Sequence, residues 1–298
     1  MLNNVQKIIC VICDEKKINC KLVSKDWIFV LQKNNKVRFV VGYKFPLNNQ
    51  CTGKICDDKF AMYDVLKEFN IPIVEHFIVF NNYNREKITE YCKNYNFNMV
   101  IKNNVGTCGN DMFHVENEND LFEKLDELLS KNYSVSLNPY YDIKTEYRII
   151  ILDNNAELVY GKKKPIVIGN GKKTIYELLC EFNPNYFISN DKAKNLTKIL
   201  DKGEIFEYNW QFNLSKGAMP FLIKDQSKTN MLVERAKQIT EILGVAFASV
   251  DLVELYDGSI LLLEVNSGVM MDNISKNFPN GKQIAKRIYS KVIDKMFE

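Results

Sequence analysis

The sequence FASVDLVEL at residues 247–255 and the sequence LLLEVNSGVMM at residues 261–271 decide the fold. Each is an apolar run that carries hard oxygen ligands, Asp251 in the first run and Glu264 and Asn266 in the second. Side chains two residues apart on a strand point to the same face, while their apolar neighbours point into a core. Carboxylate and amide oxygens suit Mg²⁺, which keeps positions open for water and phosphate. We therefore predict two adjacent strands with a magnesium site. The alternative is a buried hairpin that ends in solvated polar residues.

A glycine-containing loop lies upstream, in MVIKNNVGTCGNDMFHV at residues 99–115. The apolar run with Lys102, the loop with Gly106 and Gly109, and the second apolar run predict a strand, a phosphate loop and a strand. Glycine lets backbone N–H groups approach phosphate oxygens, and the lysine adds a positive charge beside them. The alternative is ordinary turn chemistry in a hairpin. The two commonest nucleotide signatures, GxxxxGK[ST] and GxGxxG, are both absent.

Taken in order, these features and five further motifs resemble the ATP-grasp superfamily of carboxylate-amine ligases, from about Asp58 to the C-terminus. The resemblance is greatest to the branch that contains cyanophycin synthetase and the bifunctional glutathione synthetases. The further motifs are Asp58-Lys59 at the start of a helix, Asn138-Pro139-Tyr140-Tyr141 at the hinge, Glu146-Tyr147-Arg148 at the start of a strand, IVIGNGKKTIYELLCEFN at 166–183 and Asn213-Leu214-Ser215-Lys216-Gly217. No single motif is decisive, but the set in this order is specific.

The resemblance implies an α+β ATP-grasp fold in which two α+β subdomains clasp the nucleotide. It predicts a short β-rich segment at 1–57, an N-terminal subdomain with the glycine loop at 58–140, and a C-terminal subdomain with the metal site at 141–298. ATP is the implied cofactor together with Mg²⁺, or Mn²⁺ as the alternative ion. The chain departs from the family at Asn103, where proline is common, and at Asp111, where a third glycine is common. A carboxylate at Asp111 would repel phosphate unless the backbone turns it toward solvent.

The resemblance also assigns roles to individual residues. Lys59 and Lys102 would bind the α- and β-phosphates, and the loop with Gly106 and Gly109 would close over the γ-phosphate. The remaining residues implied to bind ATP or metal are Pro139, Tyr140 and Tyr141 at the adenine; Asn213 and Ser215 near the γ-phosphate or metal; and Asp251, Glu264 and Asn266 as metal ligands. Loop capping is the alternative role for Asn213 and Ser215.

Arg148 is the candidate catalytic residue. Its planar fork suits either the transferring phosphoryl group or the substrate carboxylate. The alternative is a structural ion pair with Glu146 or with another strand neighbour. His76 and His114 lie outside the matched motifs and are predicted to be structural, so the base that deprotonates the amine is not identified.

The implied reaction joins the carboxylate of an amino acid or peptide to an amine co-substrate through an acyl phosphate, and releases ADP and phosphate. Two alternatives stay open: kinase-like phosphoryl transfer on the same fold, and a nucleotide-binding module without turnover. Similarity at the family level does not identify the substrates. A homodimer is the default expectation for the assembly.

Composition agrees with a cytoplasmic enzyme. The 298 residues are 46% hydrophobic, and 40 Lys and Arg against 37 Asp and Glu give a net charge of +3. This balance argues against a dedicated nucleic-acid binder, which would show a concentrated basic face. No stretch is long enough for a membrane span, and the N-terminal apolar run is too short for a signal peptide. Cys10 and Cys13 lie in a strand-like run, with a zinc site as the minor alternative.

Hydrophobic periodicity predicts the remaining elements. They are a hairpin at 27–32 and 36–43; a helix at 58–70 with Phe60, Tyr63, Leu66 and Phe69 on one face; strand, loop, strand, helix and strand over 97–138; two strands over 145–161; a helix that starts at the Thr174/Glu177 capping box; an irregular, polar stretch at 184–226; and helices near 228–243 and 281–297.

Overall fold

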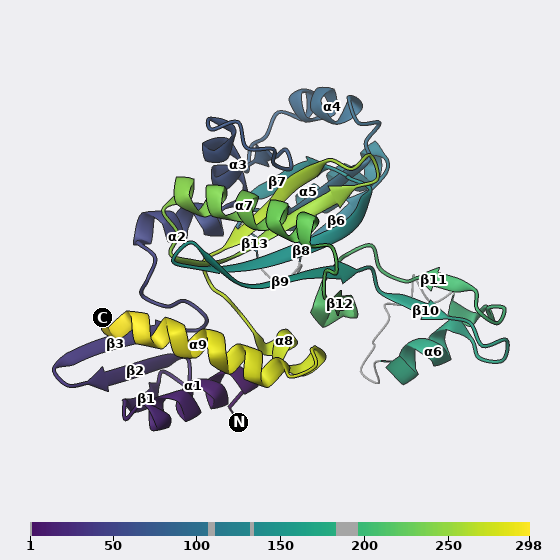
Figure 1. Ribbon diagram of the computed structural model, residues 1–298. Coiled ribbons are helices and arrows are strands. Elements are labelled where there is room, and N and C mark those ends of the chain that lie inside the picture. The colour runs from purple at the N-terminus through teal and green to yellow at the C-terminus, as the bar shows by residue number, and fades with distance from the viewer. Residues whose placement is uncertain (1, 107–110, 132–133, 183–195) are drawn as a thin grey trace. The chain divides into compact units, whose positions relative to one another are not determined.

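The structure is a computed structural model, and it describes residues 2–106, 111–131, 134–182 and 196–298 (Figure 1). The chain forms two compact units, each dense in internal contacts. The first unit comprises Met1–Gly161 and Leu222–Glu298, and the second comprises Lys162–Phe221. Among the described residues, no helix has the length and apolar character that a membrane crossing requires.

The elements of the first unit are α1 (Asn4–Glu15), β1 (Asn19–Val23), β2 (Ile28–Lys33), β3 (Lys36–Val41), α2 (Gln50–Asp57), α3 (Lys59–Lys67), β4 (Phe77–Val79), α4 (Arg85–Lys93), β5 (Met99–Asn103), β6 (Met112–Val115), α5 (Glu118–Leu129), β7 (Val135–Pro139), β8 (Ile143–Leu152), β9 (Asn155–Lys163), α7 (Gln226–Leu243), β13 (Phe247–Leu255), β14 (Ile260–Asn266), α8 (Asp272–Asn277) and α9 (Gly281–Phe297). The strand β9 continues from the first unit into the second.

A three-stranded antiparallel sheet, in the order β1-β2-β3, includes the predicted hairpin. It packs with α1 and α9, so the first and the last helix of the chain lie side by side (Figure 1). The strand predicted around Cys10 and Cys13 was wrong, because these residues lie in α1. Val5, Ile9 and Ile12 are buried at helical spacing, a pattern that the continuous apolar run conceals.

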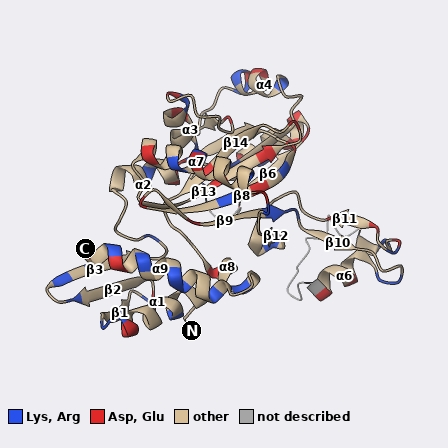
Figure 2. Ribbon diagram, in the orientation of Figure 1, with Lys and Arg blue, Asp and Glu red and all other residues tan. Residues whose placement is uncertain are grey.

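Both signs of charge occur on α7 and α9 (Figure 2). Basic residues of α9 pair with acidic residues of other elements in the first unit. Lys286 contacts Glu15 of α1 at 2.5 Å, and Lys291 contacts Glu157 of β9 at 2.7 Å. Arg287 reaches the same Glu157 carboxylate at 2.6 Å. These ion pairs join α9 to α1 and to β9.

The predicted helix at 58–70 is α3, and Asp58 caps it by accepting a hydrogen bond from the Ala61 N–H. The predicted apolar face was only partly right. Met62 and Leu66 form its buried side, whereas Phe69 is 54% exposed. The helix ends at Lys67, so Phe69 lies beyond it and does not continue the helical stripe.

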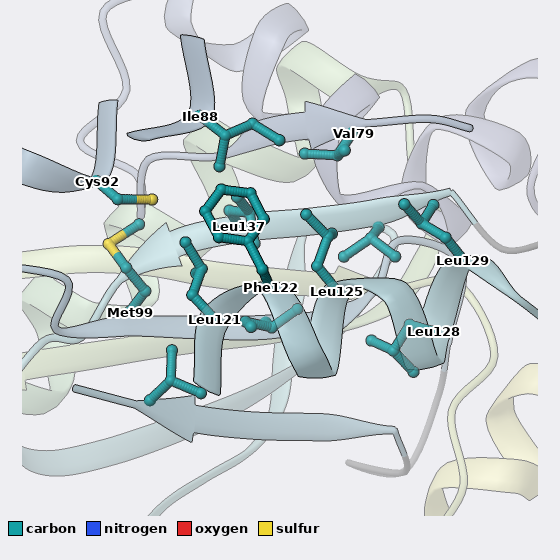
Figure 3. Packing of buried hydrophobic residues seen from close by; sticks show 13 residues of the cluster. Val79, Ile88, Cys92, Met99, Leu121, Phe122, Leu125, Leu128, Leu129 and Leu137 are labelled. Carbon is teal, nitrogen blue, oxygen red and sulfur yellow. The ribbon is translucent and has the colours of Figure 1, made fainter. Parts of the chain in front are cut away.

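A four-stranded antiparallel sheet has the order β4-β7-β5-β6, and confirms the strands and helix predicted over 97–138. One face packs against α4 and α5 in a core that Figure 3 shows from close by. Every second residue of the strands enters this core, including Met99 and Ile101 of β5 and Leu137 of β7. The intervening residues of β5 and β7 therefore point to the opposite face.

A third sheet has β9, β8, β13 and β14 as neighbours in that order, which confirms the two strands predicted over 145–161 and the two deciding strands. The helix α7 packs against β8 and β13, and buries Leu232, Ala236 and Ile239. Lys228 of α7 donates a hydrogen bond to Glu254 of β13 at 2.7 Å. The face of the sheet that carries Glu254 is therefore the face that α7 covers.

The second unit contains β10 (Ile166–Ile168), α6 (Ile175–Phe182), β11 (Ile205–Glu207), the short 3₁₀ helix η2 (Leu214–Lys216) and β12 (Met219–Phe221). The capping box is confirmed, because Thr174 and Glu177 each accept a hydrogen bond from the other's backbone N–H. A Cβ at Gly169 would collide with the backbone of Asp201, so the first glycine of the GNG sequence permits close chain approach. The stretch predicted to be irregular contains three short elements in its described part.

Candidate functional site

A buried polar surface forms the face of the β4-β7-β5-β6 sheet that points away from α5. It consists of His76, Lys102, Ser136 and Asn138, and none of these side chains is more than 7% exposed. Lys102 lies opposite Ser136 in the β5–β7 register, and Ser136 and Asn138 are two residues apart on β7. The His76 Nδ1 atom lies 2.6 Å from the Ser136 hydroxyl, which places His76 on the same face.

Lys102 is a buried lysine of this polar surface. Its ammonium makes no hydrogen bond or ion pair with the described residues. Burial, together with the nearby charge of Lys59, lowers the pKa of Lys102 to about 7, against an opposing effect of Glu264. Because an unpaired buried ammonium is costly, its presence indicates an anionic ligand.

Lys59 holds the start of the predicted phosphate loop. Its ammonium donates hydrogen bonds to the carbonyl oxygens of Asn103 at 3.3 Å, Asn104 at 3.2 Å and Gly106 at 2.6 Å. Burial lowers the pKa of Lys59, although nearby carboxylates, with Glu264 foremost, act in the opposite direction. The predicted phosphate contact of Lys59 thus requires a ligand that competes with these carbonyls.

The loop has room only for glycine at position 106. A Cβ there would lie 2.9 Å from the Asn103 Cβ atom. The predicted Gly109 lies outside the described residues. Asp111, at the far side of the loop, has its carboxylate 3.5 Å from the Lys131 ammonium. This pairing reduces the phosphate repulsion anticipated for Asp111.

The three predicted metal ligands come together on β13 and β14. Asp251 lies opposite Glu264 in the register, and Asn266 follows two residues later on the same face. The Asn266 amide donates a hydrogen bond to Glu264 at 3.0 Å. Within the described ranges, no three His, Cys, Asp or Glu side chains form a metal-holding group. The predicted magnesium site consists of two carboxylates and one amide, so it does not require three such side chains.

Arg148 binds the fully buried Asp251 through two parallel hydrogen bonds. Its Nε atom lies 2.7 Å from Oδ1 and its Nη2 atom 2.5 Å from Oδ2. Burial alone would lower the pKa of Arg148, but the charge of Asp251 raises it well above its usual value. The structure therefore shows an ion pair with a strand neighbour, and the partner is the predicted metal ligand on β13.

The strand β14, which carries two of the predicted metal ligands, also lies against α3, which carries Lys59, and against the segment that follows α3. The Val74 N–H donates to the Leu262 carbonyl at 2.9 Å, and the Val265 N–H contacts the Met62 sulfur at 3.3 Å. Glu264 is close enough for its charge to affect the pKa values of both Lys59 and Lys102. The predicted phosphate and metal residues thus form one electrostatically connected site.

The predicted hinge is fixed by packing. The Asn138 amide donates to the Pro139 carbonyl at 2.7 Å, and its Oδ1 atom is buried without a hydrogen-bond partner among the described residues. The Tyr140 ring stacks on His114, with ring centroids 4.0 Å apart. The Tyr141 hydroxyl accepts a hydrogen bond from the Glu75 N–H at 3.4 Å.

Asn213 and Ser215 lie in the second unit, at the start of η2. The Asn213 side-chain oxygen accepts hydrogen bonds from the Ser215 N–H at 2.9 Å and from the Ser215 hydroxyl at 2.8 Å. This geometry supports loop capping, which was the alternative role. Their predicted contact with phosphate or metal stays a prediction.

His76 and Ser136 were not predicted as site residues, whereas Asn138 belonged to the predicted adenine hinge. A signal was present in VSLNP at 135–139, where polar residues alternate with apolar ones in a buried strand. His76 had no such signal, because its place beside Ser136 depends on the pairing of β4 with β7.

No protein-family profile and no curated protein sequence matches the chain. The structure is similar to a bifunctional glutathione synthetase from Pasteurella multocida, with a TM-score of 0.58 and 17% identity over 97% of this chain. It is also similar to D-alanine–D-alanine ligase from Bacillus anthracis (TM-score 0.57, 16% identity, 84% of this chain and 69% of that one) and to the ATP-grasp ligase PsnB, solved with a precursor variant, Mg and ADP (TM-score 0.52, 10% identity, 83% and 61%).

The chain has the ATP-grasp fold. The predicted α+β ATP-grasp class is thereby confirmed. The chain covers only 44% of the length of the glutathione synthetase. With identities of 10–17%, the similarity to these ATP-grasp proteins establishes the fold, and the reaction must be argued from the side chains.

Proposed function

We propose that this ATP-grasp protein binds ATP with Mg²⁺ and joins a carboxylate to an amine, with release of ADP and phosphate. The observation that carries the proposal is the buried, unpaired ammonium of Lys102. It faces the same region as Lys59 and Glu264, so an anionic ligand and its counter-ion would complete the charge balance. A nucleotide polyphosphate supplies that anion.

The donor set fits a hard divalent cation. Asp251, Glu264 and Asn266 offer carboxylate and amide oxygens, and the hydrogen bond from the Asn266 amide nitrogen leaves its oxygen available. When bound there, Mg²⁺, or Mn²⁺ as the alternative, would neutralise the charge of the phosphates. Both Asp251 oxygens accept a hydrogen bond from Arg148, so a bound cation would share this carboxylate with the guanidinium.

The remaining residues would orient the reactants. Lys59 and Lys102 would bind the α- and β-phosphates, and the loop from Gly106 to Gly109 would cover the γ-phosphate and exclude water. Arg148, fixed by Asp251, would hold the transferring phosphoryl group or the substrate carboxylate with its unused N–H groups. Pro139, Tyr140 and Tyr141 would border the adenine.

The chemistry would proceed in two steps. The substrate carboxylate attacks the γ-phosphorus, and the bond to the β-bridging oxygen breaks, which gives an acyl phosphate and ADP. The amine then attacks the acyl carbon, phosphate leaves, and the amine loses a proton to give an amide. Because both initial reactants are anions, the cationic residues must be in place before the first step.

Substrates are proposed as a class. An amino acid or peptide provides the carboxylate and a second molecule provides the amine, by analogy with the glutathione synthetase, the D-alanine–D-alanine ligase and the precursor complex of PsnB. We further propose that the chain divides into a β-rich segment at 1–57 and two subdomains at 58–140 and 141–298, and that it assembles as a homodimer.

The test is ADP formation from Mg–ATP in the presence of pooled amino acids and dipeptides, with mass spectrometry of each active pool. A ligase gives a condensation product with the mass of an amide. A phosphorylated product that accumulates as such would favour kinase-like transfer. Nucleotide binding without ADP formation in any pool would favour a module without turnover. Hydroxylamine should divert the acyl phosphate to a hydroxamate when the amine is withheld.

A further inference from the structure

Three cysteines meet between α1 and the β1-β2-β3 sheet. Cys10 and Cys13 lie one helical turn apart on α1, and Cys20 lies on β1. Cys20 is opposite the fully buried Leu31 of β2, so its side chain points to the buried face of the sheet, and β1 packs against α1. Cys13 is itself fully buried, whereas Cys10 and Cys20 are partly exposed. The helix and the sheet thus bring three thiols together.

Hydrogen bonds connect the three sulfur atoms. The Cys10 thiol donates to the Cys20 sulfur, and the Cys20 thiol donates to the Cys13 sulfur. The hydrogen bond from Cys20 lowers the pKa of Cys13, and the same bond, together with burial, raises the pKa of Cys20. Burial and the charge of Cys20 raise the pKa of Cys10 to about 11. Cys13 is therefore the thiol of this cluster that loses its proton most easily.

The connection between α1 and β1 holds Cys13 close to Cys20. The Ile18 N–H donates to the Cys13 carbonyl at 2.8 Å, which turns the chain from the helix toward the strand. A bond between the two sulfurs would close only this short connection. The buried Cys56 and Cys92 differ, because among the described residues no other cysteine acts on the pKa of either thiol.

We infer that Cys13 and Cys20 form a reversible oxidation site, at which a hydroperoxide converts the two thiols into a disulfide. The partly exposed Cys20 sulfur attacks the terminal peroxide oxygen, and the O–O bond breaks. The thiol proton passes by way of Cys13 to the leaving oxygen, which departs as water or an alcohol, and Cys20 becomes a sulfenic acid. The Cys13 sulfur then attacks the Cys20 sulfur, the S–O bond breaks, and hydroxide leaves with the Cys13 proton as water. The peroxide gains two electrons, and each sulfur loses one.

Oxidation and metal binding are the two kinds of chemistry open to a cluster of cysteines. Of the residues that the structure describes, no three His, Cys, Asp or Glu side chains have the arrangement that holds a metal ion. We therefore assign the cluster to oxidation. The inference does not depend on the proposed function, because neither a nucleotide nor a ligase substrate takes part.

The test is peptide mapping of the intact chain before and after treatment with hydrogen peroxide. Remaining thiols are blocked with iodoacetamide in urea, and the chain is digested with trypsin. Cleavage after lysine separates residues 8–16, which contain Cys10 and Cys13, from residues 18–21, which contain Cys20. A disulfide between Cys13 and Cys20 joins these two peptides, and mass spectrometry should detect the joined pair. Dithiothreitol should release both peptides.

Two variants assign the partner of Cys20. Cys10→Ser should form the joined pair at about the wild-type rate, whereas Cys13→Ser should form it at least about tenfold more slowly, because the attacking sulfur is gone. Cys92 is the internal control, and its thiol should still be alkylated in the oxidised protein. Peroxide-treated wild type without the joined pair would overturn the inference, and this measurement needs no variant. Formation of the pair at the wild-type rate in folded Cys13→Ser would overturn it too.

Discussion

Arg148 and Asp251 face each other across β8 and β13 and share two hydrogen bonds of 2.7 and 2.5 Å. The contact joins the candidate catalytic residue to a candidate metal ligand. Because Asp251 is fully buried, each residue neutralises a charge that would otherwise stand alone. Substitutions at either position therefore change stability as well as any activity.

Asp251→Ala and Arg148→Met should each lower the free energy of unfolding by about 3–5 kcal/mol, because each leaves a buried charge without its partner. The double variant Arg148→Met/Asp251→Leu should recover most of this loss. Urea denaturation measures the free energy of unfolding of the two single variants and of the double variant. Asp64→Asn, at an exposed position of α3 without an ion pair among the described residues, is the control and should change stability little. Single variants as stable as the wild type would contradict this role of the pair.

Lys102→Met should stabilise the protein in the absence of nucleotide, by about 1–3 kcal/mol at pH 7, since it removes an unpaired buried ammonium. The same variant should lose the increase in melting temperature that Mg–ADP gives the wild type. Thermal unfolding with and without Mg–ADP tests both effects. A destabilised variant that still gains stability from Mg–ADP would contradict the assignment of Lys102.

The pKa of Lys102 also predicts a direction for pH effects. Its folded value of about 7 lies below that of an unfolded lysine, so the unfolded chain binds more protons between about pH 7 and pH 10. The contribution of Lys102 to stability therefore rises with pH through this window. A phosphate beside Lys102 should raise its pKa again, so nucleotide binding at pH 8 should take up protons.

Calorimetric titration with Mg–ADP in two buffers of different ionisation enthalpy measures that uptake. The wild type should take up a fraction of a proton, at most about one, and Lys102→Met should take up less. Net proton release by the wild type, or equal uptake by the variant, would count against the buried lysine as the phosphate partner.

Gly106→Ala should weaken Mg–ADP binding about tenfold or more, because the new methyl group would lie 2.9 Å from the Asn103 Cβ atom and displace the loop that Lys59 holds. Gly53→Ala is the matched control. It lies in α2, where a Cβ meets no atom closer than 4.0 Å, so binding should not change. Unaltered affinity in Gly106→Ala would show that the loop start does not position the nucleotide.

Sequence patterns predicted those parts of the site that depend on local alternation. Asp251, Glu264 and Asn266 were placed on two adjacent strands because polar residues interrupt apolar runs at strand spacing. The bidentate contact of Arg148 with Asp251 could not be predicted, since it depends on the register between β8 and β13. The pairing of His76 with Ser136 is likewise tertiary. The strand predicted around Cys10 was wrong because a continuous apolar stretch is compatible with either a buried strand or a buried helix.

The most direct test of the central claim follows an oxygen atom. Pools that yield a condensation product should be run with ¹⁸O in both oxygens of the substrate carboxylate, and the released phosphate analysed by mass spectrometry. If the carboxylate attacks the γ-phosphorus and the amine later displaces phosphate, one ¹⁸O atom must appear in each released phosphate. Unlabelled phosphate released together with the amide product would contradict an acyl-phosphate ligase.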